Sequence, residues 1–179
     1  MNKVDFVAMD VETANKDIGS ICQIGLAAFK DGVLVREWSS LINPEEEFSA
    51  FNINIHGLTA SDVAEAPTLP DVAVVLRSWL NRQVVVCHTL FDQRALTQGF
   101  AKYRLPQLKC LWLDSCRVAR QTWDSPDGYS LPVLCGLIGH EFQHHDALED
   151  AKAVGALILS AGLKTGLTPA AWLKGETKF

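Results

Sequence analysis

The fold is decided by the stretch Val4-Asp5-Phe6-Val7-Ala8-Met9-Asp10-Val11-Glu12-Thr13. Its apolar run is only five to six residues long and rich in β-branched and aromatic side chains, which predicts a buried strand rather than a helix. Side chains two positions apart on a strand point the same way, so Asp10 and Glu12 are expected to lie side by side at the strand's end. Two carboxylates that close repel each other, and a shared proton, a cation or solvent must offset the repulsion. On these residues alone, a strand that frays into a polar loop is the simpler interpretation, and the rest of the chain decides between the two.

Length and composition indicate one globular domain. The chain has 179 residues, of which 48% are hydrophobic and 21% are charged, a balance typical of a folded domain with a sizeable core. We expect this domain to cover residues 1–163, with residues 164–179 forming a short tail packed on it. The net charge of −5 argues against a strongly basic nucleic-acid coat, although the segment 94–120 carries six basic residues and one acid.

The sequence also predicts a cellular location. No apolar run reaches the roughly 18 residues that a membrane span needs. The first residues, Met1-Asn2-Lys3, lead directly into a charged strand rather than into a secretory signal. The five cysteines form no CxxC pair, which is typical of buried free thiols in a reducing compartment. We therefore expect a cytoplasmic protein that makes no contact with a membrane.

The remaining chain alternates strands with helices. Asp31-Gly32 lies between two apolar runs and predicts an antiparallel hairpin. Thr59 or Ser61 is expected to cap a short helix, and Pro169 to open another near the end of the chain. The expected strands are 4–13, 21–29, 33–42, 84–87 and 110–113, and the expected longer helices are 69–81, 92–103, 115–121, 131–138 and 146–160. This order predicts a mixed α/β sheet covered by helices.

Two further acids are expected to join Asp10 and Glu12. Asp92 follows the strand 84–87 and opens a helix, and ligand sites of α/β sheets gather outside the carboxyl ends of strands. Asp146 and Asp150 are both candidates for the second of these acids, since residues four apart share a helix face. We favour Asp150, because Asp146 is accounted for as a cap or first-turn acid favoured by the helix dipole.

Four carboxylates at one sheet edge would repel each other strongly without a cation. All-oxygen ligation suits Mg²⁺ or Mn²⁺ better than zinc. A pair of such ions about 3.5–4 Å apart is the arrangement that cleaves phosphodiesters by in-line attack. The sequence therefore predicts a two-metal phosphodiester-cleaving site.

Three motifs carry a resemblance to a known family. They are Asp10-Val11-Glu12-Thr13, His88-x-x-Phe91-Asp92 and His145-x-Ala147-x-x-Asp150-Ala151, supported by Gln23-Ile24-Gly25, by Ile55-His56-Gly57-Leu58-Thr59 and by Tyr129-x-Leu131. In this order and spacing, from about Asp5 to Ala161, the chain resembles the DEDDh 3′→5′ exonucleases. These include the proofreading exonucleases of the bacterial DNA polymerase III epsilon type and ribonuclease T.

The resemblance implies a ribonuclease H-like three-layer fold with sheet order 3-2-1-4-5, in which strand 2 runs antiparallel to the rest. It implies that Asp10, Glu12 and Asp150 hold the metal that activates water. Asp10 and Asp92 would serve a second metal, which stabilises the leaving 3′ oxygen, and His145 would be the general base. The resemblance accordingly implies two Mg²⁺ or Mn²⁺ ions as the cofactor.

The resemblance also implies the substrate contacts. Thr13 and Ala14 would offer backbone groups to the terminal nucleotide, with Ile55 and His56 against its base. The substrate would be a 3′ end of single-stranded nucleic acid, with DNA favoured and RNA left open. A homodimer and a polymerase partner both stay open. The chain departs from many family members at Thr89, where they have Asn, and at residues 14–15, where they have Thr-Gly. Both departures concern positions on the side of the site that faces the substrate.

Three further features are expected to take no part in catalysis. His88 is interpreted as a histidine that packs or that supports the site from behind the metal-binding side chains, and Phe91 as a core residue rather than a platform for a base. His140-Glu141-x-x-His144 matches the pattern of zinc peptidases, which requires both histidines on one continuous helix, and Gly136 and Gly139 weaken a helix there. Because the pattern itself is present, a zinc peptidase stays as the alternative enzyme. A catalytically silent nucleic-acid-binding relative is the other alternative, although all five catalytic positions are present.

Overall fold

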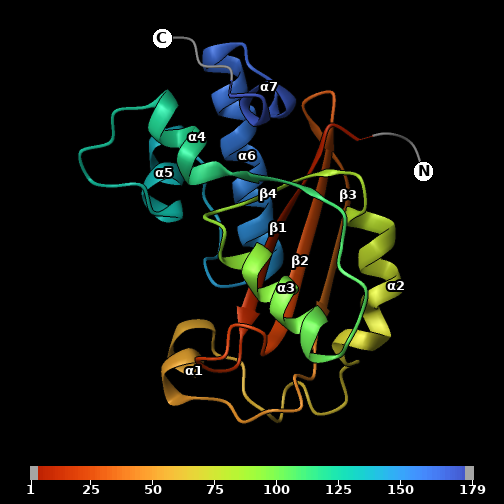
Figure 1. The fold of residues 1–179 in the computed structure, drawn as a ribbon. Coiled ribbons are helices and arrows are strands. Elements are labelled where there is room, and N and C mark those ends of the chain that lie inside the picture. Colours follow the sequence, from red (N-terminus) through yellow and green to blue (C-terminus); the bar gives the residue numbers. More distant parts are fainter. Residues whose placement is uncertain (1–3, 176–179) are drawn as a thin grey trace.

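The computed structural model describes residues 4–175 and contains one five-stranded sheet in the order β3-β2-β1-β4-β5 (Figure 1). β2 pairs antiparallel with both of its neighbours, whereas β1, β4 and β5 pair in parallel. The strands are β1 (Phe6–Thr13), β2 (Ile21–Lys30), β3 (Val33–Leu41), β4 (Val84–Cys87) and β5 (Leu111–Asp114). The predicted order and the antiparallel second strand are both confirmed.

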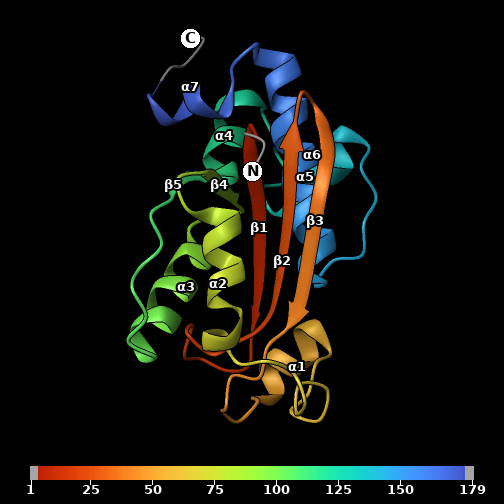
Figure 2. The ribbon, with the colours of Figure 1, turned by 90° about the vertical axis from the view of Figure 1, so that its right-hand side faces the viewer.

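Helices cover the two faces of this sheet. α2 (Leu69–Leu80) and α3 (Phe91–Lys102) lie on one face, and α6 (Ala147–Thr165) lies on the other (Figure 2). α4 (Ser115–Thr122) and α5 (Leu131–Ile138) pack against α6. α7 (Pro169–Leu173) packs near β5, and its Trp172 is buried in the same core as α6. None of the helices in the described part of the chain has the length and apolar character needed to cross a membrane.

β1 is the central strand and is buried on both faces. Phe6 and Ala8 belong to the core under α6, whereas Val7 and Met9 belong to the core under α2 and α3. Side chains alternate along a strand, so Asp10 and Glu12 continue the row of Phe6 and Ala8 toward α6. Burial of the apolar residues thus fixes which face the two carboxylates occupy.

The close approach of α6 to β2 depends on a glycine. A Cβ atom built on Gly25 would lie 2.1 Å from the backbone oxygen of Ala147, far inside van der Waals contact. Gly25 pairs with Asp10 in the β1–β2 register, and the Ala147 N–H donates to Gln23 Oε1 at 3.2 Å. The first turn of α6 therefore lies directly on β2, beside the acidic end of β1.

One helix was not expected, and one expected helix is absent. α1 (Ala50–His56) lies beyond the carboxyl end of β1 (Figure 1), with Ser49 as its N-cap and Gly57 ending it in the left-handed conformation. The alternation of Phe51, Ile53 and Ile55 with polar residues hides its helical character, and it buries none of its residues. Residues 59–66 form only turns instead of the helix expected after Thr59 or Ser61.

The last long helix is longer than expected. α6 continues past residue 160 to Thr165 and ends at Gly166, which has a left-handed φ of 72°. The first part of the expected tail is thus helical, and residues 176–179 of it lie outside the described residues. All five cysteines are free, as expected.

Candidate active site

Three carboxylates converge at the end of β1. One oxygen atom from each of Asp10, Glu12 and Asp150 lies within 4.8 Å of the others. Asp150 reaches them from the first turn of α6 and is only 2% exposed. Asp146 instead caps α6, and its Oδ1 accepts from the N–H groups of Leu148 and Glu149 at 3.0 and 3.1 Å. Asp150 and not Asp146 therefore joins the carboxylates of β1, and its role as the functional acid stays a prediction.

Asp92 adjoins this cluster from α3. Its Oδ1 accepts a hydrogen bond from the Val11 N–H at 2.9 Å, and Val11 lies between the two acidic residues of β1. Asp92 is 2% exposed, and among the neighbouring charges its effect on the pKa of Asp10 is the largest. The bond to Val11 uses one oxygen of Asp92, and so ties the start of α3 to the acidic end of β1.

Burial raises the pKa of every carboxyl in this group, and repulsion between carboxylates adds to it for Asp10, Glu12 and Asp92. For Asp10 and Glu12 burial is the largest cause, and the neighbouring carboxylates come next. Together they raise the pKa of Glu12 to about 8 and that of Asp10 well above its ordinary value. The pKa of Asp92 is raised to about 7 by burial, and burial also raises that of Asp150. Such a group stays ionised near neutral pH only if a cation offsets the repulsion. Its oxygen donors are those that Mg²⁺ or Mn²⁺ prefers, so the residues fit the expected ions.

Two histidines border the carboxylates. His145 precedes the first turn of α6, as expected, and its backbone has a left-handed φ of 69°. Its N–H donates to Asp150 Oδ2 at 2.6 Å, and its Nδ1 lies 3.9 Å from Glu12 Oε1. His144 Nδ1 lies within hydrogen-bonding distance of Asp150 Oδ1, at 2.6 Å. Burial, followed by the neighbouring His144, lowers the pKa of His145.

The geometry of a zinc peptidase is not formed. α5 ends at Ile138, Gly139 takes a left-handed φ of 70°, and residues 140–146 are not helical. His140 and His144 therefore do not share the face of one continuous helix, which this chemistry demands. Among the described residues, His140 joins no group of side chains that could hold a metal ion.

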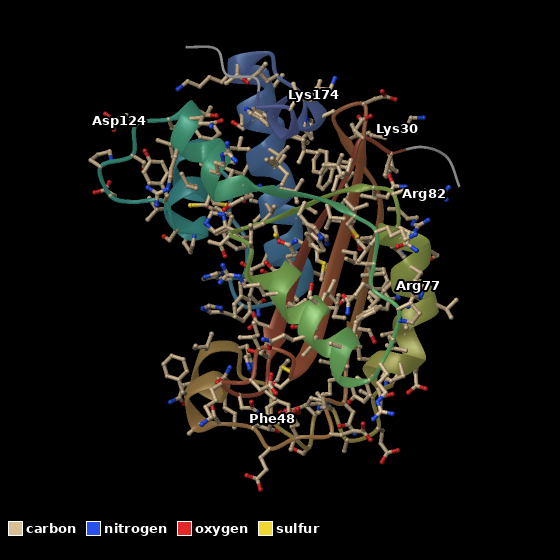
Figure 3. All side chains as sticks on the ribbon, viewed as in Figure 1. Lys30, Phe48, Arg77, Arg82, Asp124 and Lys174 are labelled. Atoms are coloured by element: carbon tan, nitrogen blue, oxygen red, sulfur yellow. The ribbon has the colours of Figure 1, made fainter. Side chains whose placement is uncertain are left out.

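A cavity of about 860 Å³ opens beside Glu12, between the end of β1 and α1. Thr13, Ile55 and His56, three of the four expected substrate contacts, line it. Phe48, at the α1 end of the molecule (Figure 3), also lines it, as do Phe51, Asn52 and Phe91. No periodic pattern in the sequence pointed to these four residues, because they come from a loop, the unexpected helix α1 and the start of α3.

The expectation that Phe91 is a core residue is wrong. Phe91 is 39% exposed and lines the cavity, because it is the first residue of α3 and precedes the buried positions of that helix. His88, by contrast, packs as expected. Its Nδ1 and Nε2 lie 2.9 Å from Ser115 Oγ and from the Tyr129 carbonyl oxygen.

Ala14, the fourth expected substrate contact, has no free backbone group. It is fully buried, its N–H donates to the Ser20 carbonyl at 2.8 Å, and its carbonyl accepts from the Ser49 N–H at 2.9 Å. The expected contact through Ala14 is corrected accordingly. The carbonyl of Thr13 is also engaged, by Asn52 Nδ2 at 2.8 Å and by His56 Nε2 at 3.1 Å. These bonds hold α1 against the end of β1.

Comparison with known proteins gives consistent results. The RNase_T family, described as exonuclease, matches residues 7–158. The PolC-type DNA polymerase III of Oceanobacillus iheyensis is 30% identical over 157 residues, which cover 86% of this chain and 11% of that protein. The corresponding protein of Bacillus subtilis is 26% identical over 159 residues, again 86% of this chain and 11% of the relative. The chain thus spans about a tenth of the length of these curated relatives.

Solved structures share the fold. Exonuclease X in complex with 5′ overhanging duplex DNA is 26% identical with a TM-score of 0.76, over 92% of this chain and 95% of that one. The nuclease domain of 3′hExo, described as a DEDDh family member bound to rAMP, is 18% identical with a TM-score of 0.74, over 89% and 92% of the two chains. At that identity the second likeness concerns the fold alone.

Proposed function

Because the chain belongs to the RNase_T exonuclease family, we propose that it is a DEDDh-type enzyme that releases nucleoside monophosphates from the 3′ ends of single-stranded nucleic acid. The observation that carries this proposal is the convergence of Asp10, Glu12 and Asp150, with Asp92 beside them, next to a cavity lined by aromatic rings. DNA is the favoured substrate, since the curated relatives are named as DNA polymerases and one solved neighbour holds DNA.

The carboxylates would hold two Mg²⁺ or Mn²⁺ ions. Asp10, Glu12 and Asp150 would serve one ion, and Asp10 with Asp92 the other. When bound, such ions supply positive charge to the phosphate group and lower the pKa of water. One oxygen of Asp92 already accepts a hydrogen bond from the Val11 N–H, which fixes the orientation of this carboxylate. We expect metal dependence because burial, followed by repulsion among these groups, raises the pKa values of Asp10 and Glu12 in the protein alone.

His145 would accept the proton of the attacking water at a ring nitrogen. Its lowered pKa keeps the ring neutral, and therefore able to accept a proton, near neutral pH. Asp150 fixes its backbone through the 2.6 Å bond from the His145 N–H. The side chain of His145 is 40% exposed, so water and substrate can reach its ring.

The cavity beside Glu12 would hold the terminal nucleotide. Ile55 and His56 would contact its base, and the exposed rings of Phe91 and Phe51 offer faces on which unpaired bases can stack. Stacking suits single strands, because a base in a duplex keeps its neighbours on both faces. Thr13 lines the cavity from the end of β1, next to the acidic pair.

The test is an end-labelled strand assay. Single-stranded DNA and RNA of equal sequence, labelled at the 5′ end, are offered with Mg²⁺ and with EDTA. We expect a ladder of products shortened from the 3′ end with Mg²⁺, none with EDTA, and none from Asp10→Asn in either condition. Cleavage of a circular single strand would contradict the proposal, as would activity that survives EDTA or returns only with zinc.

A polymerase is the partner class that the relatives suggest. The matched segment is 11% of proteins named PolC-type DNA polymerase III, so its counterpart there belongs to a polymerase chain. We propose that this chain works beside a polymerase, with a homodimer as the alternative. Sedimentation of the protein alone and mixed with a bacterial replicative polymerase distinguishes the two.

A further inference from the structure

The loop before α6 brings two imidazole rings onto one carboxylate. The rings of His144 and His145 are stacked, with centroids 3.8 Å apart and planes 25° apart. His144 Nδ1 lies 2.6 Å from Asp150 Oδ1. One ligand atom from each of the three residues lies within 4.8 Å of the other two. This set contains two nitrogen donors and one oxygen donor, unlike the all-oxygen set at the end of β1.

The donor chemistry selects a different class of ion. Imidazole suits Zn²⁺, Cu²⁺ and Ni²⁺, whereas Mg²⁺ prefers oxygen and dehydrates reluctantly. We propose that His144, His145 and Asp150 form a binding site for a transition-metal ion of the zinc class, which shares Asp150 with the carboxylate cluster and stops the nuclease when it is filled. The inhibitory part of this inference rests on the proposed function, and the binding part does not.

The backbone makes the arrangement available. Adjacent side chains normally diverge, but His145 has a left-handed φ of 69°, and the two rings lie face to face. The histidine side chains are 39% and 40% exposed, so an ion can reach them from solvent. Asp150 holds the ring of His144 and the backbone N–H of His145. Three protein donors leave the fourth position of the tetrahedral set that zinc prefers to a water molecule.

Binding requires one exchange of protons. In the tautomer in which His144 Nδ1 donates to Asp150 Oδ1, that nitrogen must give up its hydrogen before it can bind the ion. When the ion takes that position, the neutral ring keeps its hydrogen on Nε2 instead, with solvent carrying the proton between the two nitrogens. No redox step and no further reactant is needed.

The consequence follows from two shared groups. A filled site engages Asp150, which the carboxylate cluster needs, and the ring of His145, which is the proposed proton acceptor. Excess Mg²⁺ competes only for the carboxylate, because it has little affinity for imidazole. Zinc is therefore expected to remain bound in a large excess of magnesium.

Binding is tested with zinc itself against a chromophoric zinc chelator, in millimolar Mg²⁺. Wild type and His140→Ala, which removes a histidine of the same loop outside the cluster, are expected to take up one equivalent. His144→Ala is expected to bind zinc at least about tenfold more weakly, since it loses one of three donors. Equal uptake by His144→Ala, or release of zinc from wild type by magnesium alone, would overturn the inference.

Inhibition is tested on the same three proteins. Each Mg²⁺-supported rate is compared with its own zinc-free value as zinc is raised. Wild type and His140→Ala are expected to be inhibited at the same zinc concentration, and His144→Ala only at a concentration about tenfold higher or more. Equal sensitivity of His144→Ala would overturn the inhibitory role. A protein without nuclease activity would refute the proposed function, while the chelator experiment would still decide the metal site.

Discussion

His145 and Asp150 belong to the same motif, but their positions predict different defects when they are removed. His145→Ala leaves all four carboxylates in place, so Mn²⁺ affinity should stay near that of wild type. Its single-turnover rate should fall by about 10²–10⁴-fold, the usual contribution of a general base. Asp150→Asn removes an anionic ligand that is 2% exposed, so its Mn²⁺ affinity should fall together with its rate.

Calorimetric titration of Mn²⁺ into both variants, beside their single-turnover rates, separates these roles. The wild-type rate should fall as the pH drops through the pKa of His145, which lies below the ordinary value for histidine. His145→Ala should lack this acid limb at saturating metal. If His145→Ala lost Mn²⁺ as severely as Asp150→Asn, His145 would be a ligand rather than a base.

At the scale of single residues, the sequence predicts which residues carry the chemistry better than it predicts what surrounds each of them. The four carboxylates and His145 could be placed because strand alternation and helix starts fix where such side chains lie. Phe91 and Ala14 could not, because their roles depend on exposure and on bonds from distant loops. Phe91 opens α3 on its solvent side, and the amide of Ser49 uses the carbonyl of Ala14.

At the scale of elements, the contact between β2 and α6 positions Asp150 against Asp10. Gly25→Ala would place a methyl group 2.1 Å from the Ala147 oxygen, and backbone atoms on both sides must shift. We expect a loss of about 1–3 kcal/mol in the free energy of unfolding, together with weaker Mn²⁺ binding as Asp150 moves away. Urea unfolding and metal titration measure both effects.

Gly136→Ala is the matched control for this variant. Gly136 lies inside α5, and a methyl group added there would meet no atom of another element within 4 Å, so alanine should be neutral or stabilising by up to about 1 kcal/mol. If Gly25→Ala had the same free energy of unfolding and the same Mn²⁺ affinity as this control, the close packing of α6 would not be what places Asp150.

Elements with a clear apolar period could be predicted, and short ones without it could not. The five strands and the helix at 131–138 follow from their apolar runs. α1 was missed because it buries no residue, and a helix without a buried face has no apolar period to detect. Its two caps, Ser49 and Gly57, were the remaining signal.

At the scale of the whole molecule, the acidic cluster predicts a metal-dependent pH profile of stability. The pKa of Glu12 is about 8 and that of Asp92 about 7, both raised above their values in the unfolded chain. Their contribution to stability is therefore complete below the unfolded pKa values and is lost as the pH rises toward 8. In EDTA, the melting temperature should fall as the pH is raised from neutrality toward the pKa of Glu12 at about 8.

Bound Mg²⁺ or Mn²⁺ should oppose this loss, and more so at the alkaline end of the window, where the ion displaces fewer protons. The pKa values of His56, His88 and His145 are lowered, so these three histidines titrate below this window. Thermal unfolding of wild type and of Glu12→Gln, with EDTA and with Mn²⁺, measures the effect. A wild-type melting temperature in EDTA that rose across this window would contradict the predicted sign.

The direction of digestion tests the central claim most directly. A linear single-stranded DNA carrying one label on its 3′-terminal nucleotide and another at its 5′ end is digested with Mg²⁺, and the products are followed in time. The 3′ label should appear first as a mononucleotide, while the 5′ label stays on progressively shorter strands. Early release of the 5′ label, or of the 3′ label on an oligonucleotide, would contradict a 3′→5′ exonuclease built on Asp10, Glu12, Asp92 and Asp150.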